Sequence, residues 1–146
     1  MSLGIVNASK VTVVYTCIYT IAMYYEIYVK LTTLRKYHLK GKVVNRYDCP
    51  ELHSSDRLTA NFREWTIPFL GPVFCLGLTD QLDDESNMSL KYAWTYVGLR
   101  GLYVLLVMKY GIHTGGINKP LWISTFPGYY CLTMLGWNAL TNVLSL

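Results

Sequence analysis

The chain has 146 residues, which is enough for one domain with a sizeable core. Apolar residues make up 52% and charged residues only 15%, whereas an average soluble domain has about 25% charged residues. This composition excludes a disordered chain and argues against an ordinary soluble domain. The formal net charge of +4 is modest, and without a clustered basic face it gives no indication of nucleic-acid binding.

Four apolar segments are predicted to cross a membrane, because a spanning helix takes about 20 mostly apolar residues. They lie at about 5–31, 58–79, 92–110 and 120–146. The 13 tyrosines and 4 tryptophans agree with this prediction, since such rings favour membrane interfaces. The first segment is too long for a removable signal peptide, so we expect a retained anchor. The predicted fold is an all-α integral membrane protein, with residues 1–146 as a single four-transmembrane-helix bundle.

The charges between these segments predict the orientation of the chain. The first loop region is basic and carries Arg35, Lys36, Lys40, Lys42 and Arg46, and the second is acidic and carries Asp80, Asp83, Asp84 and Glu85. By the positive-inside rule, the first and third loops face the cytoplasm and both termini face the opposite side. The polar stretch 37–56 is expected to be a loop. The glycosylation sequons at Asn7 and Asn87 lie too close to the predicted bilayer for us to expect modification.

The cysteines and histidines give no metal or redox signal. The four cysteines show no Cys-x-x-Cys spacing, and the histidines His38, His53 and His113 do not share a metal-ligand spacing. We therefore expect unpaired thiols, no disulfide framework and no metal site.

The second segment begins with a row of polar side chains on one helical face. Arg57, Asn61, Glu64 and Pro68 stand at i, i+4, i+7 and i+11, and a helix places such residues above one another. A guanidinium, an amide and a carboxylate in one row are suited to a small zwitterion, whose carboxylate and amine they would hold. The alternative is an intrahelical ion pair that anchors the end of the helix. The spacing leaves both interpretations open.

A second polar face is predicted on the third segment, with Tyr96, Arg100 and Tyr103 at i, i+4 and i+7. An unpaired arginine near the middle of a membrane is costly. We therefore expect Arg100 to form a lock between helices with a carboxylate, either Glu64 or Glu26. Tyr103 lies nearer the cytoplasmic side and is freer to meet a ligand. Glu26 is also expected to pair with Lys30, four residues later on the same helix.

These residues carry a family resemblance. The second segment contains Arg57-x-x-x-Asn61-x-x-Glu64-x-x-x-Pro68-Phe69. This motif resembles the signature of the MAPEG family (membrane-associated proteins in eicosanoid and glutathione metabolism). The family includes the microsomal glutathione transferases. The pair Arg100-x-x-Tyr103 is similar to the family's motif in its third span. The resemblance implies a trimer of four-helix subunits with glutathione bound between neighbours, near the cytoplasmic side.

The resemblance also implies roles for individual residues. Arg57, Asn61, Glu64 and Arg100 would form the glutathione-binding set, and Tyr103 would add a hydrogen bond. The family usually has an arginine at the start of its fourth span, which stabilises the glutathione thiolate and so lowers the pKa of the thiol. Lys119 stands at that place here. It supplies a positive charge without the planar fork of arginine.

Two positions depart from the family pattern. Val107 stands where a second aromatic hydroxyl is common, and Ala60 stands where the prostaglandin-forming members carry another arginine. These departures keep the binding face and weaken the machinery that activates the thiol, so they bear on catalysis more than on fold.

Two functions are therefore expected. The first is a membrane glutathione transferase or peroxidase, in which the glutathione thiolate attacks lipophilic electrophiles or lipid hydroperoxides that enter from the bilayer. The alternative is a catalytically degenerate accessory subunit of a larger membrane complex. The expected partners are membrane lipids, lipophilic small molecules, and either two further copies of the chain or other subunits. The expected location is the endoplasmic reticulum or a mitochondrial membrane.

Overall fold

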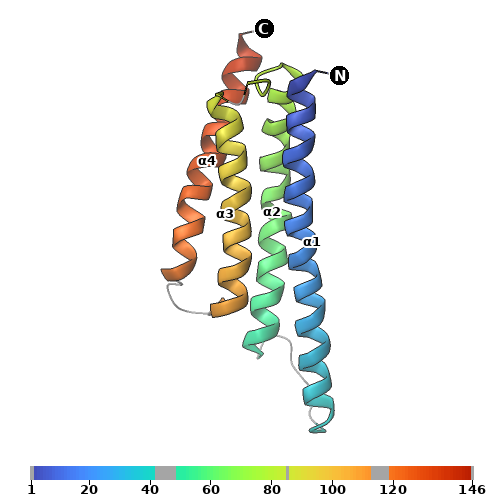
Figure 1. Cartoon of the computed structure of the whole chain (residues 1–146). Helices are drawn as coiled ribbons and strands as arrows, with labels where there is room; N and C mark the ends of the chain where they lie inside the picture. Colours follow the sequence, from blue (N-terminus) through green and yellow to red (C-terminus); the bar gives the residue numbers. More distant parts are fainter. Residues whose placement is uncertain (1, 42–48, 85, 113–118, 146) are drawn as a thin grey trace.

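The computed structural model describes residues 2–41, 49–84, 86–112 and 119–145. Four long helices run up and down in a bundle, with no strand in these ranges (Figure 1). They are α1 (Leu3–His38), α2 (Pro50–Leu78), α3 (Met88–Tyr110) and α4 (Lys119–Leu144). Helix α1 packs along α2, and α3 along α4, while α2 also contacts α4 and α1 contacts α3. The predicted all-α architecture with four helices is confirmed.

Local sequence signals fix where the helices begin and end. The Ser2 hydroxyl accepts the Ile5 N–H at the start of α1, at 3.4 Å. The Asn87 side chain accepts the Ser89 N–H at the start of α3, at 2.8 Å. Such caps satisfy backbone donors that have no partner within the helix. Gly111 follows α3 with a φ of 70°, a conformation that glycine adopts without strain.

Helices α1 and α2 are longer than predicted. The loop expected at 37–56 is therefore wrong at its C-terminal boundary, which lies before residue 56. Helix α2 begins at Pro50 instead of near residue 58. Proline is favoured in the first turn, and Glu51 beside it interacts well with the positive end of the helix dipole. Helix α1, about 54 Å long at 1.5 Å per residue, extends past the other helices at the end opposite the termini (Figure 1).

An aromatic cluster forms the centre of the core. Tyr15 of α1 packs on Phe69 of α2 with ring centroids 4.9 Å apart, and Phe69 packs on Tyr96 of α3 at 4.4 Å. All three rings are buried. The Tyr15 hydroxyl shares a hydrogen bond with Thr66 at 3.0 Å, so this phenol keeps a polar partner inside the bundle. The cluster holds three helices in a fixed rotation around their axes.

Small residues bring α1 and α2 into close contact near the termini. A Cβ added at Gly77 would lie 2.8 Å from the Ala8 Cβ and 3.2 Å from the Gly4 carbonyl oxygen. A Cβ at Gly4 would in turn lie 2.7 Å from the Gly77 carbonyl oxygen. Glycine is therefore required on both sides of this contact, as is common where two helices approach closely.

The outside of the bundle is rich in large apolar side chains. Strongly exposed examples are Val13, Tyr24, Leu31, Ile67, Leu105, Ile123, Trp137 and Leu144. By length and composition, one helix of the described chain, Leu3–His38, is long and apolar enough to cross a membrane. Helices α2 and α3 carry several charges, and α4 is rich in glycine, proline, asparagine and tyrosine. Crossing by these three helices therefore stays a prediction.

Candidate functional site

The predicted binding row lies on the outer side of α2. Arg57, Glu64 and Pro68 are exposed, and Asn61 between them is half-buried. The apolar side of the same helix, with Leu58, Phe62 and Phe69 among others, faces the core. Within the described ranges the salt bridges belong to Lys30, and neither Arg57 nor Glu64 forms one. The alternative interpretation, an ion pair within α2, is therefore not what the structure contains.

Arg100 of α3 is buried, with 7% of its surface exposed. Its Nε donates a hydrogen bond to the Tyr96 hydroxyl at 2.8 Å, and its Nη1 donates one to the Asn61 Oδ1. Aromatic rings surround the guanidinium carbon, at 4.9 Å from the Tyr96 centroid, 5.8 Å from Phe62 and 5.9 Å from Tyr103. Neutral oxygens and π faces thus stabilise the charge.

The predicted lock between Arg100 and a glutamate is not formed within the described chain. Glu64 lies on the outer side of α2, away from the core, and Glu26 pairs with Lys30 on α1. The physical reason is the rotation of α2, which turns Asn61 toward α3 and leaves the carboxylate of Glu64 facing outward. The predicted Glu26–Lys30 pair is confirmed.

Tyr103 lies beside Arg100 on the polar face of α3. Its ring centroid is 5.9 Å from the guanidinium carbon of Arg100. It is 7% exposed and lines a narrow cleft between α3 and α4, together with Arg100, Ser124 and Tyr129. The sequence predicts a tyrosine that is free to meet a ligand, whereas in the single chain its ring is packed and it borders this narrow cleft.

Lys119 is the first residue of α4 and is exposed. It forms no salt bridge with the described residues. The start of α4 lies at the same end of the bundle as the start of α2 and the end of α3 (Figure 1). Arg57, Tyr103 and Lys119 therefore belong to the same half of the molecule, although no direct contact joins Lys119 to the other two.

An ion pair between helices was missed by the sequence analysis. Lys30 of α1 contacts Asp56 of α2 at 3.0 Å, in addition to its pair with Glu26. The sequence signal was the placement of opposite charges near the facing ends of two consecutive helices. This contact fixes α1 against α2 one residue before Arg57.

Some predicted features fall outside the described residues, namely the basic Lys42 and Arg46, the acidic Glu85 and the histidine His113. Over the described ranges, no group of three or more His, Cys, Asp or Glu side chains is arranged to hold a metal ion. Comparisons with known protein families, with curated proteins and with solved structures found no match for this chain.

Proposed function

We propose that this chain is a MAPEG-like membrane glutathione transferase or peroxidase. The observation that carries the proposal is the outward row on α2, where Arg57 and Glu64 are exposed and form no salt bridge with the described residues, and Asn61 lies between them. A single helix thus presents a cation and an anion at its surface, with an amide between them.

The length of this row suits glutathione. Glu64 follows Arg57 by seven positions, which corresponds to about 10 Å along a helix. An extended tripeptide spans about the same distance. Glutathione carries carboxylates and an ammonium, so Arg57 would hold a carboxylate, Glu64 the ammonium, and the Asn61 amide nitrogen a further oxygen, since its Oδ1 already accepts from Arg100.

The proposed chemistry begins with ionisation of the glutathione thiol. Lys119 would favour the thiolate through its positive charge, and Tyr103 would donate a hydrogen bond. In the transferase reaction the thiolate sulfur forms a bond to an electrophilic carbon, and the leaving group departs with the electron pair of the broken bond. In the peroxidase reaction the thiolate attacks the terminal oxygen of a hydroperoxide, the O–O bond breaks, and the alkoxide leaves and takes up a proton to become the alcohol. The thiol of a second glutathione then attacks the sulfur of the resulting glutathione sulfenic acid, which forms the disulfide and releases water.

The membrane setting and the trimer are part of the same proposal. Exposed apolar side chains on all four helices would face lipid or a neighbouring copy. Basic residues gather at the α1–α2 end of the bundle and acidic residues at the α2–α3 end. By the positive-inside rule, the α1–α2 end would then face the cytoplasm. In a single chain, Arg57 and Glu64 lie on the exposed side of α2. A second copy would supply the other side of the proposed glutathione site. The membrane is that of the endoplasmic reticulum or the mitochondrion.

One observation favours the accessory role as a second candidate. Val107 is buried on α3 and has no hydroxyl, so this position supplies no second phenol for the thiol. Together with lysine instead of arginine at position 119, this is consistent with a chain that retains the fold and has lost thiol activation.

Calorimetric titration of glutathione into the purified protein tests the proposal. Wild-type protein is expected to bind, and Arg57→Gln and Glu64→Gln are each expected to weaken binding by about tenfold, since each removes a charge-assisted hydrogen bond. Arg63→Gln is the matched control, because Arg63 is exposed on the same helix but lies off this row. Absence of binding to folded wild-type protein would refute the proposal.

A further inference from the structure

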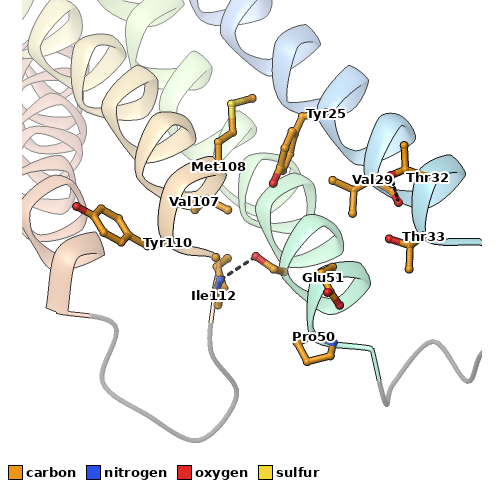
Figure 2. A pocket seen from close by; sticks show the side chains of 12 residues that line it. Tyr25, Val29, Thr32, Thr33, Pro50, Glu51, Val107, Met108, Tyr110 and Ile112 are labelled. Atoms are coloured by element: carbon orange, nitrogen blue, oxygen red, sulfur yellow. Dashed lines mark hydrogen bonds between the residues drawn. The ribbon is translucent and has the colours of Figure 1, made fainter. Parts of the chain in front are cut away.

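A cavity of about 410 Å³ opens between α1, the start of α2 and the end of α3 (Figure 2). Its apolar wall includes Val29, Val107, Met108 and Ile112. On one side, the Ile112 N–H donates a hydrogen bond to the Ser54 hydroxyl at 2.7 Å, which ties the end of α3 to α2. The cavity is therefore framed by three helices, and a direct contact joins α2 to the segment that follows α3.

The polar groups at this cavity are hydroxyls, which both donate and accept hydrogen bonds, and one carboxylate. Thr32 and Thr33 line it on α1, next to Val29, and Glu51 lines it on α2 (Figure 2). The Thr32 hydroxyl donates to the Tyr28 carbonyl at 2.8 Å, so its lone pairs are what it offers to a ligand. The Tyr25 side chain lies over the cavity between Met108 and Val29 (Figure 2). Glu51 is the charged residue among the described lining residues.

The Glu51 carboxylate stays ionised at neutral pH. The Cys49 thiol donates a hydrogen bond to its Oε2 at 3.1 Å, and this bond lowers the pKa of the carboxyl, with smaller contributions from the backbone N–H of Glu51 and the charge of Lys36. Glu51 also precedes the predicted second span, so it lies at the polar end of the bundle.

We propose that this cavity binds a small amphiphile with a protonated amine. The ammonium would contact the Glu51 carboxylate and the threonine hydroxyls, and the apolar part would lie against Val107 and Met108. At about 30 Å³ for each non-hydrogen atom, the volume holds roughly 14 such atoms, the size of an arylalkylamine or a short alkylamine. The Glu51 carboxylate disfavours a carboxylate or phosphate ligand, which would face a like charge.

This site is independent of the proposed glutathione site. Glu51 lies almost two helical turns before Arg57 and takes a ligand of opposite charge. Glu64→Gln serves as a matched control, because it removes a carboxylate from the same helix outside the cavity. Loss of amine binding and loss of glutathione binding can therefore be measured separately.

Fluorine NMR with para-fluorophenethylamine tests the inference, with the corresponding alcohol and para-fluorophenylacetate as neutral and anionic analogues. All titrations use one detergent concentration, so that partition into micelles cancels between variants. The amine is expected to bind at least about fivefold more tightly than the alcohol, with no measurable binding of the acetate.

Three variants complete the test. Glu51→Gln is expected to reduce amine affinity to that of the alcohol, and Thr32→Trp, at an exposed residue of the lining, to abolish binding of both. Lys36→Met is expected to raise amine affinity about twofold, because it removes a cation that interacts with Glu51. Equal binding of amine and alcohol to wild-type protein, or amine binding that Thr32→Trp leaves intact, would overturn the proposal.

Discussion

Arg100 of α3 donates a hydrogen bond to Asn61 of α2, and this contact joins the two polar faces of the bundle. The guanidinium is enclosed by the rings of Phe62, Tyr96 and Tyr103. The amide oxygen of Asn61 and the phenol oxygen of Tyr96 thus accept the hydrogen bonds that a carboxylate was expected to accept. The consequence is that Glu64 remains outside the core, where a ligand can reach it.

Asn61→Leu is expected to lower the free energy of unfolding by about 1–3 kcal/mol, because it leaves a buried guanidinium N–H without its acceptor. Asn61→Asp keeps the shape and gives Arg100 an anionic partner, so it is expected to unfold at or above the wild-type temperature. Thermal unfolding in one detergent, followed by circular dichroism, measures both. Equal stability of the leucine variant and the wild type would show that the contact does not hold the two helices together.

Gly77→Val is expected to destabilise the protein by about 1–3 kcal/mol, because its side chain would meet Ala8 and the Gly4 backbone where α1 and α2 approach most closely. Gly71→Ala on the same helix is the control, since an added Cβ there has no neighbour within 4 Å. It is expected to leave stability within about 0.5 kcal/mol of the wild type or to raise it. A similar loss in both variants would contradict the close contact.

Lys30→Met is expected to cost about 1 kcal/mol of stability, because it removes a cation that contacts Glu26 and, across to α2, Asp56. Lys10→Met is the comparison, since Lys10 is exposed and forms no salt bridge with the described residues. The loss in Lys30→Met is expected to shrink at high salt, because half-buried ion pairs of this kind are partly screened. Denaturant titration at two salt concentrations measures the effect.

Single cysteines placed at opposite ends of the bundle test the proposed orientation. In a background without the four native cysteines, Lys40→Cys and Asp84→Cys are expected to react with a membrane-impermeant maleimide from opposite sides of sealed vesicles. A third variant keeps Cys17, which is exposed on α1, as its single cysteine. It is expected to react only after detergent is added, since lipid would cover this position. Labelling of both engineered positions from one side would contradict the four-span topology.

Periodicity predicted the helices and the composition of each face, and it could not predict how the helices rotate against one another. The row Arg57, Asn61, Glu64 follows from helical spacing alone and is found on one side of α2. The partner of Arg100 depends on the angle between α2 and α3, which the packing of Tyr15, Phe69 and Tyr96 determines. A pattern read along one chain contains no such angle.

The helix ends and the membrane spans show a second limit of prediction from the sequence. Hydropathy does not detect the start of α2, because its first turns are polar. The start is indicated instead by Pro50 and Glu51, which are residue types favoured in the first turn of a helix. Over the described residues, the same measure detects a spanning candidate in α1 alone. Charged residues lower the mean hydropathy of α2 and α3, and Tyr, Trp, Gly and Pro lower that of α4, although Tyr and Trp suit membrane interfaces. The Lys30–Asp56 contact was missed because it joins residues of two helices.

The central claim is that the α2 row binds glutathione and that the chain ionises its thiol. Ultraviolet difference absorbance of the purified protein during a glutathione titration measures both, through the absorption band of the thiolate. We predict a saturable band that is lost in Lys119→Ala, where the activating charge is removed, and shifted to higher glutathione concentrations in Arg57→Gln. A folded wild-type protein that gives no band, or a band that neither variant changes, would contradict the account.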